Sequence, residues 1–329
     1  MAKQTEGSHK PLIAILMATY EPREDWLREQ LDSLEAQTYP NLRLYIRDDH
    51  SSEAAFAALQ ACASARIRSF PFELRRNEEK LGSNATFERL TREAEGDYFA
   101  YCDQDDVWLP EKLSTLLDAI EAQRAQLVCS DMFIIDENGT RTADSITQVR
   151  RHHVFKSGEG LAPQLLIANF ATGCTTLVNA EQARAAVPFC PYMVHDHYLA
   201  LWCAARGSVV SLPRQLINYR IHAHNQTTIM TGVVDKATYI EVRIRKAIRR
   251  LEWLRERMRG QGDLSAAIDR TLNWTRARER CFAGDARARR EVWRARDLSP
   301  VTSVFDIVMA GAPDWMFRGC IGLLRRNVI

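Results

Sequence analysis

The sequence predicts an α/β protein in which a doubly wound, mostly parallel sheet is followed by a helical C-terminal region. To about residue 130, short apolar runs alternate with segments of helical periodicity, the order expected for parallel strands joined by crossover helices. Polar clusters follow several of the apolar runs. From residue 232 onward the pattern indicates helices alone.

Each element of the first part is expected from its own pattern. Residues 12–18 form a continuous apolar run, which is typical of a strand buried on both faces. Pro22 opens the first helix, whose early acids suit a helix N-terminus, and Ser52 caps the second. The other expected strands are residues 42–46, 69–74, 98–101 and 127–129, and the other expected helices are residues 83–95 and 110–124.

Composition narrows the class of protein. The chain has 329 residues and a formal net charge of +2, so nothing in it indicates a nucleic-acid partner. Its eight cysteines are scattered without zinc-site spacing, as expected for buried thiols in a reducing compartment. Residues 1–10 are polar and expected to be disordered, with no signal-peptide core, and no apolar run is long enough to span a bilayer. These features favour a cytoplasmic location, with peripheral attachment to the inner face of the membrane left open.

The polar clusters fall after the expected strands. They are Thr19-Tyr20, Asp48-Asp49, residues 75–82, residues 103–106 and Ser130-Asp131. In a parallel sheet the carboxyl ends of strands share one edge, where ligands bind. The sequence therefore predicts one polar site at that edge.

The densest cluster is the acid run Asp103, Asp105 and Asp106, which lies between an apolar strand and a helix expected to begin at Pro110. Crowded carboxylates repel one another, and a hard divalent cation such as Mg²⁺ or Mn²⁺ removes that cost. The alternative is an acidic turn that caps the following helix. Trp108 is expected to pack in the core.

Several of these motifs resemble those of family 2 glycosyltransferases of the GT-A fold. They are Ala18-Thr19-Tyr20, the run Arg47-Asp48-Asp49-His50-Ser51-Ser52, the loop from Asn77 through Leu81-Gly82 to Phe87, and Asp103-Gln104-Asp105-Asp106-Val107-Trp108. The last motif is most similar to the rhamnosyltransferase-like branch, which builds bacterial surface polysaccharides such as lipopolysaccharide. The resemblance covers residues 11–225, and Glu21-Pro22 departs from the family's usual Asn-Gly.

The resemblance implies a nucleotide-sugar site. Asp49 would accept the ring N–H of uracil or thymine, which favours UDP- or dTDP-linked donors. Asp103 would face the ribose. The other expected donor contacts are Thr19, Tyr20, Arg76, Lys80, Gly82, Asp131, Gly173 and Arg220. For Asp48 and Asp49 the alternative is capping of the helix that follows them.

The resemblance also implies a metal and a general base. Asp105 would bind Mn²⁺ or Mg²⁺, His222 would be a further ligand, and Asp106 would support the site. Asp196, at an expected helix start, matches the family's general base; the alternative is a simple N-cap. His195 and His197 are expected at the polar surface, with a role as ligands the alternative, and a solvated surface loop is the alternative for His222. Residues 150–153 resemble a lid on the acceptor side.

These inferences predict a catalytic domain over residues 11–231 and a helical region over residues 232–329. The expected reaction is inverting, metal-dependent transfer of a sugar, with L-rhamnose favoured, from a nucleoside diphosphate to a glycan or lipid-linked glycan. Two alternatives stay open: a sugar-nucleotide-binding scaffold without activity, and a sugar-nucleotide pyrophosphorylase, although no glycine-rich, lysine-containing loop follows the first strand.

The helical region itself allows two interpretations. Ile240, Ile244, Ile248, Leu251 and Met258 recur at helical spacing, and arginines fill the other face. The tail, residues 305–329, combines Trp315, Phe317, Ile321, Leu323 and Leu324 with arginines. The region is either a helical appendage packed on the catalytic domain or a peripheral contact with anionic lipid.

Overall fold

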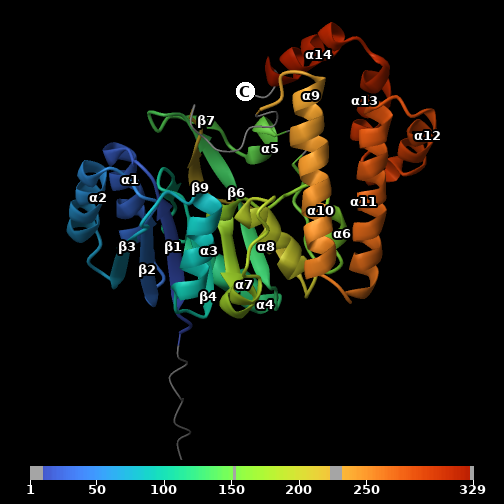
Figure 1. The fold of residues 1–329 in the computed structure, drawn as a ribbon. Helices are drawn as coiled ribbons and strands as arrows, with labels where there is room; N and C mark the ends of the chain where they lie inside the picture. Colours follow the sequence, from blue (N-terminus) through green and yellow to red (C-terminus); the bar gives the residue numbers. More distant parts are fainter. Residues whose placement is uncertain (1–9, 151–152, 223–231, 327–329) are drawn as a thin grey trace, which may run out of the picture.

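The computed structural model describes residues 10–150, 153–222 and 232–326 and contains the predicted α/β core (Figure 1). The expected disorder of residues 1–9 lies outside the described residues. The first elements follow the predicted order within a few residues. They are β1 (Ile13–Thr19), α1 (Glu24–Glu35), β2 (Leu42–Asp48), α2 (Glu53–Arg66), β3 (Phe72–Arg76), α3 (Ser83–Glu93) and β4 (Tyr98–Cys102).

The sheet is parallel in its first half and mixed in its second. Within the described residues it has nine strands, in the order β3-β2-β1-β4-β8-β6-β9-β5, with β7 paired to β6. β1 pairs in parallel with β2 and β4, whereas β8 (Thr176–Asn179) lies antiparallel between β4 and β6. The later part of the chain therefore adds antiparallel strands to the predicted parallel core.

Some strands differ from the sequence-based prediction, and β3, β5 and β6 show how. β3 begins later than expected, at Phe72. β6 (Leu127–Ile135) continues through the polar pair Ser130-Asp131, which was predicted to lie beyond the strand. β5 (Val107–Trp108) was not predicted, because two residues carry no periodic pattern; it pairs with the end of β9 (Val209–Arg220).

Helices cover both faces of the sheet, and β1 shows how the sequence divides between them. Ile13, Ile15 and Met17 pack in one core with α1, α2 and α4 (Lys112–Ala122). Ala14 and Leu16 pack in a second core with α3 and α8 (His195–Ala204). Alternate residues of a strand point to opposite faces, so a continuous apolar run is needed to fill two cores.

The elements between β6 and α8 are short and connect the two halves of the sheet. They are β7 (Arg141–Ala143), α5 (Ile146–Val149), α6 (Ala162–Leu165), the 3-10 turn Gly173–Thr175 and α7 (Ala180–Ala185).

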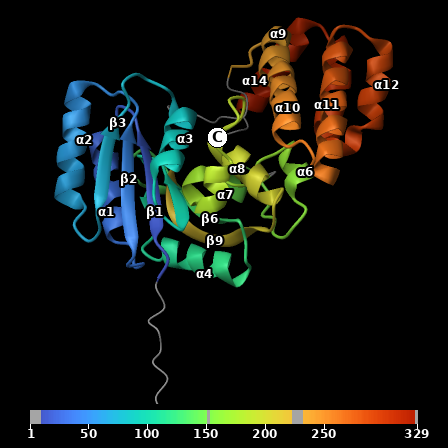
Figure 2. The same cartoon turned by 60° about the horizontal axis from the view of Figure 1, so that its bottom comes forward.

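The C-terminal region consists of helices, as predicted, and stands beside the sheet (Figure 2). Leu251 and Leu272, from two of its helices, share a core with Tyr198 of α8, so the region packs on the α/β part. None of the described helices is long and apolar enough to cross a membrane. The elements are α9 (Lys236–Tyr239), the π-turn Ile240–Arg245, α10 (Lys246–Arg257), α11 (Gly262–Phe282), α12 (Ala286–Arg294), the 3-10 turn Arg296–Leu298, α13 (Pro300–Gly311) and α14 (Asp314–Arg326).

Candidate active site

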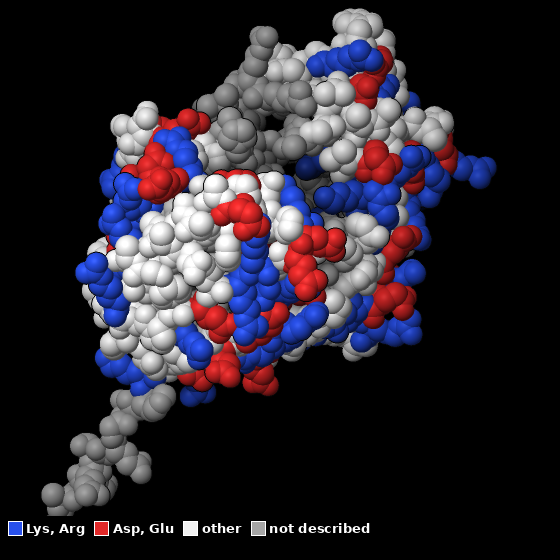
Figure 3. All heavy atoms as spheres, turned by 60° about the vertical axis from the view of Figure 1, so that its left-hand side comes forward, with Lys and Arg blue, Asp and Glu red and all other residues white. Residues whose placement is uncertain are grey.

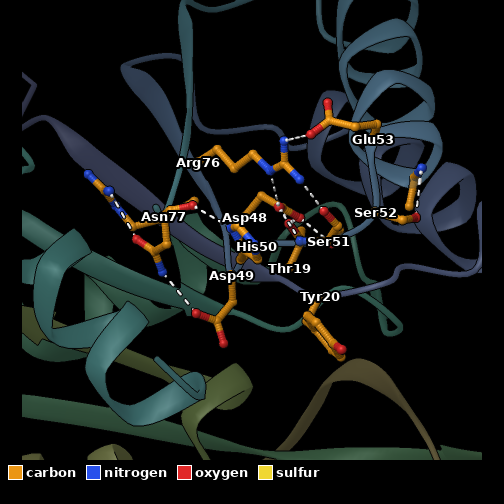
Figure 4. A network of polar contacts seen from close by, with 12 residues as sticks. Thr19, Tyr20, Asp48, Asp49, His50, Ser51, Ser52, Glu53, Arg76 and Asn77 are labelled. Atoms are coloured by element: carbon orange, nitrogen blue, oxygen red, sulfur yellow. Dashed lines mark hydrogen bonds and ion pairs between the residues drawn. The ribbon is translucent and has the colours of Figure 1, made fainter. Parts of the chain in front are cut away.

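At the end of β2, Asp48 is a fully buried structural acid (Figure 4). Its Oδ2 accepts the Ser51 backbone N–H at 2.8 Å, and its Oδ1 accepts the hydroxyls of Ser51 and Thr19. A buried carboxylate with several donors holds a turn in place. Asp48 therefore fixes the β2–α2 turn, the alternative considered for one of this pair.

The neighbouring Asp49 is also buried and holds the loop before α3. Its Oδ1 accepts from Asn77 Nδ2 at 2.9 Å and from the Leu81 backbone N–H at 2.8 Å, and its Oδ2 accepts the Gly82 N–H at 2.7 Å. Gly82 has a φ of +85°, a conformation that favours glycine. The Gly82 N–H donates to Asp49. Asp49, although distant in the sequence, thereby caps the N-terminus of α3.

Tyr20 lies on the open side of this loop. Its ring is 40% exposed, and Lys80 Nζ lies 3.6 Å from the ring centroid. Figure 4 shows the Tyr20 and Asp49 side chains directed toward the same side of the strand ends. Arg76 points elsewhere: its guanidinium binds Glu53 and the Ser51 carbonyl. The structure thus brings Tyr20, Lys80 and Asp49 together and engages Arg76 in the β2–α2 turn.

The departure at Glu21-Pro22 has a local explanation. Glu21 adopts a φ of +41°, and its carboxylate accepts the backbone N–H and the hydroxyl of Ser52. The β1 loop is therefore tied to the start of α2. It is also tied to the acid run, because the Gln104 side-chain amide donates to the Tyr20 carbonyl and its oxygen accepts the Tyr20 N–H at 2.8 Å.

The acid run lies between β4 and β5, and two groups of ligand-type atoms gather there. Asp105 Oδ2 lies 2.8 Å from His222 Nε2, which brings the two predicted metal ligands together. The ligand atoms of Asp103, Asp106 and Cys174 lie within 4.8 Å of one another. Cys174 was not predicted as a site residue, because a lone cysteine in an apolar segment suggests core.

Burial makes these acids hard to ionise together. The pKa of Asp103 is raised well above its usual value by burial, and then by the charges of Asp106 and Asp105. Burial, with the charge of Asp105, raises the pKa of Asp106 to about 7. Asp106 Oδ2 is buried and has no hydrogen-bond partner among the described residues. A cation would relieve this repulsion and supply the missing partner.

The residues present fit a hard divalent cation. Carboxylate oxygens and an imidazole suit Mn²⁺, and carboxylates suit Mg²⁺. Burial raises the pKa of Cys174 well above its usual value, so its sulfur stays a thiol, which is a poor metal ligand. Asp105 and His222, supported by Asp103 and Asp106, are therefore the donor set that matches such an ion.

Asp196 opens α8 and faces the 3-10 turn. Its Oδ2 accepts the Gly173 N–H at 3.0 Å, and its Oδ1 accepts from Asn169 Nδ2 at 3.2 Å. Burial raises its pKa to about 6 despite these bonds. Its charge in turn contributes to the raised pKa of Asp103, so the predicted base lies near the acid run. Gly173 is needed here, since an added Cβ would lie 2.9 Å from His195 Nε2.

The predicted surface position of His195 and His197 is wrong. The His195 ring packs 4.1 Å from the Phe87 ring and 5.3 Å from the Tyr101 ring, between centroids. His197 is buried, and its Nε2 lies 2.6 Å from the Leu165 carbonyl oxygen. Burial lowers the pKa of both to about 3, so both imidazoles are neutral. Histidines at a helix start look polar in sequence, and the packing of α8 beneath the sheet places them inside.

Arg220 and Asp131 also lie inside the protein. The Arg220 guanidinium binds Glu29 and donates to the Asp105 carbonyl at 2.8 Å, and its backbone N–H donates to Asp106 Oδ1 at 3.0 Å. Asp131, within β6, accepts from Gln215 Nε2 at 2.9 Å and from the Ile146 N–H at 3.1 Å. This geometry gives Arg220 a role in supporting the acid run and Asp131 a role in fixing α5.

Lys112 lies beside the acid run and Cys174 and was not predicted from the sequence. It is fully buried in the first turn of α4, where its Nζ donates to the Cys174 carbonyl and lies 3.1 Å from the centroid of the Trp108 ring. Burial lowers its pKa to about 7. A lysine early in a helix is ordinarily solvated. Lys112 is buried because the 3-10 turn lies over α4, and the sequence does not show that placement. Trp108 is in the core, as predicted.

Not every hollow belongs to this site. An open cavity of about 710 Å³ lies between α1, β5 and the β6–β7 turn and is lined by residues such as Glu29, Trp108 and Arg141. None of the predicted donor contacts lines it. The strand-end cluster of Tyr20, Asp49, the acid run and Asp196 is therefore the candidate active site.

Comparison with known proteins agrees with this geometry. Residues 14–181 match the family described as Glycosyl transferase family 2. The match covers half of the chain, and the chain belongs to that family. The predicted GT-A fold is also confirmed: S. aureus TarS residues 1–349, solved with UDP-GlcNAc, superposes with a TM-score of 0.57 at 14% identity, over 80% of this chain and 70% of that one.

Two curated relatives carry functional names. The chain is 24% identical to the dTDP-rhamnosyl transferase RfbG of Shigella flexneri, over 68% of this chain and 76% of that protein. It is 26% identical to the UDP-Glc:alpha-D-GlcNAc-diphosphoundecaprenol beta-1,3-glucosyltransferase WfgD of Escherichia coli, over 58% of this chain and 68% of that protein.

Proposed function

We propose that this glycosyltransferase moves a sugar, L-rhamnose first among the candidates, from a nucleoside diphosphate to a glycan acceptor in surface polysaccharide synthesis, with inversion at the anomeric carbon. The observation that carries the proposal is the half-buried Asp196 carboxylate. It accepts the Gly173 N–H, and its charge contributes to the raised pKa of Asp103 in the acid run. Residues 11–231 would form the catalytic domain.

In this proposal Asp196 takes the proton of the acceptor hydroxyl. The acceptor oxygen forms its bond to the anomeric carbon as the bond from that carbon to the diphosphate oxygen breaks, and the electron pair leaves with the nucleoside diphosphate. A pKa of about 6 leaves Asp196 ionised near neutral pH and basic enough to share the proton during attack. Asp103 orients the ribose of the donor.

The base of the nucleotide would lie at Tyr20, with Thr19 and Asp49 beneath it. The exposed Tyr20 ring offers a stacking surface, and Lys80 beside it offers a positive charge for the diphosphate. Both Asp49 oxygens already accept hydrogen bonds from the protein. Each carboxylate oxygen has two lone pairs, and we propose that a lone pair still free on Asp49 accepts the ring N–H of the nucleotide base.

A bound Mn²⁺ or Mg²⁺ would neutralise the diphosphate as it leaves. Asp105 and His222 would hold it, while Asp106 and Arg220 keep the acid run in position.

Two kinds of donor are supported by the named relatives. The likeness to RfbG supports dTDP-rhamnose, and the likeness to WfgD supports UDP-glucose and an acceptor linked to a polyprenyl diphosphate. We place dTDP-rhamnose first, because the Asp-Gln-Asp-Asp-Val-Trp run resembles the rhamnosyltransferase-like branch.

The test is thermal stabilisation by a panel of nucleotide sugars with and without Mn²⁺, followed by a transfer assay with the best binder. Stabilisation by dTDP-rhamnose above UDP-glucose, UDP-GlcNAc and dTDP alone supports the donor assignment. Stronger stabilisation by another sugar nucleotide overturns the rhamnose assignment and leaves the transferase assignment standing. Binding without transfer to any glycan acceptor would favour the scaffold alternative, and release of nucleoside triphosphate from pyrophosphate and the sugar nucleotide would favour the pyrophosphorylase.

A further inference from the structure

Helix α13 is turned with its polar side inward. Ser303 and Asp306, one turn apart, are fully buried. Asp306 accepts the Tyr239 hydroxyl at 2.7 Å and pairs with the buried Arg278, and the Trp274 indole N–H donates to Ser303 Oγ at 3.2 Å. These contacts fix which face of α13 packs on α9 and α11.

The opposite face of α13 is apolar and exposed. Val301, Val304 and Val308, which share this face at helical spacing, are 78%, 48% and 53% exposed. The acid of α13, Asp306, points inward, so the valine face carries no charge. A helix on a protein surface ordinarily shows the reverse arrangement. Exposed contiguous apolar faces of this kind mark interaction surfaces.

α14 also exposes apolar residues. Trp315 is 74% exposed and Leu323 is 64% exposed, and the exposed Gly319 between them has no neighbouring atoms where a Cβ would stand. Phe317 and Ile321, which the sequence analysis grouped with this tail, are instead buried against Tyr239. The exposed apolar residues of α13 and α14 are named together as the valine stripe: Val301, Val304, Val308, Trp315 and Leu323.

The helix beside α13 is basic on its exposed face. Arg287, Arg290 and Arg294 share the exposed face of α12, opposite the buried Ala288 and Val292. No ion-pair partner for these three arginines is found in the part of the chain that the structure describes. α12 packs beside α13 at the edge of the helical region (Figure 1). By contrast, basic and acidic side chains are interspersed on the α1–α2 side of the molecule (Figure 3).

We infer that α12, α13 and α14 dock the protein on an anionic lipid bilayer. An uncharged valine face can enter the boundary between headgroups and acyl chains, and tryptophan is favoured at that depth. Unpaired arginines nearby gain from the negative surface potential of anionic lipid. A protein partner would match the valines equally well, and the arginines of the neighbouring helix α12 favour the membrane.

The position of the stripe suits such docking. In Figure 1 the chain enters β1 from below, so the carboxyl ends of β1 and β2 point upward, and α14 lies at that same upper end of the molecule. α14 therefore lies at the end of the molecule where the candidate active site lies. The inference does not depend on the donor sugar, and its test uses no transfer activity.

The experiment is flotation of the full chain with vesicles of phosphatidylcholine alone or with phosphatidylglycerol, at low and high salt. The expected result is binding to the phosphatidylglycerol vesicles that falls with salt. The triple variant V301S/V304S/V308S should reduce the bound fraction at least tenfold. V154S, at a valine that is 54% exposed outside the stripe, is the matched control and should bind as the wild type does.

A second variant tests the cations separately. R290E/R294E should abolish the preference for phosphatidylglycerol while leaving thermal unfolding and nucleotide binding unchanged. Absence of flotation by the wild-type chain at low salt would overturn the inference. So would a valine-dependent dimer or a captured protein without flotation, since either would assign the stripe to a protein interface.

Discussion

Two groups of buried acids stand on either side of β1, and they differ in how their oxygens are used. Asp48 and Asp49, at the end of β2, accept donors from two loops. Asp106, after β4, keeps one buried oxygen without a partner among the described residues. Satisfied buried acids hold a loop in place, whereas crowded acids with raised pKa values mark a place where a ligand is expected. The first group holds loops beside the candidate site, and the second has an unsatisfied oxygen that a ligand could use.

The largest expected effect concerns Asp196, the proposed general base. Asp196→Asn keeps the side-chain shape and removes the proton acceptor, so the transfer rate should fall about 10²- to 10⁴-fold. Donor affinity should stay within about twofold, because the proposed nucleotide contacts lie elsewhere. Rates from acceptor titration and dissociation constants from calorimetry separate the two, with the exposed Asp269→Asn as control. Wild-type turnover would remove the catalytic assignment.

The metal assignment predicts a smaller change. Asp105→Asn should weaken Mn²⁺-dependent nucleotide binding by about 10- to 100-fold, the usual cost of disturbing a metal site. Calorimetry with Mn²⁺ and with EDTA measures this, and Asp118→Asn on the exposed face of α4 should behave as the wild type. Equal nucleotide affinity in EDTA and in Mn²⁺ for the wild-type protein would refute metal dependence.

Substitution of Asp48, in the first group, should lower stability and leave the chemistry unchanged. Asp48→Asn leaves an amide among donors that need an acceptor, and the free energy of unfolding should fall by about 1–2 kcal/mol. Urea denaturation measures the loss. An unchanged midpoint, with loss of donor binding instead, would move Asp48 from the structural group into the binding group.

The smallest expected effect is on pH dependence. The carboxylate of Asp196 is the active form and its pKa is about 6, so the transfer rate should fall as pH decreases through 6. The slope should approach tenfold per pH unit, which gives about a tenfold loss at pH 5. A rate that is flat from pH 5 to 7, measured under saturating donor and metal, would contradict this role.

Sequence patterns predicted the parts of this molecule that depend on residues close together in the sequence. The strand Ile13–Thr19 is apolar on both faces, and the acid run lies between recognisable elements, so both were expected. The depth of His197 and Lys112 was not, because burial of a polar side chain depends on which distant carbonyl lies above it. The inward polar face of α13 was missed for the same reason: Asp306 is inside only because Arg278 and Tyr239 meet it there.

Gln104 has a consequence for engineering. Its amide makes two hydrogen bonds with the Tyr20 backbone, so the loop proposed to hold the nucleotide base and the acid run are joined through one side chain. Because both bonds go to backbone atoms, the link depends on the side chain at position 104 and not on the one at position 20. Residues of the first loop could therefore be exchanged to change base preference as long as Gln104 is kept, whereas a change at position 104 would separate the loop from the acid run.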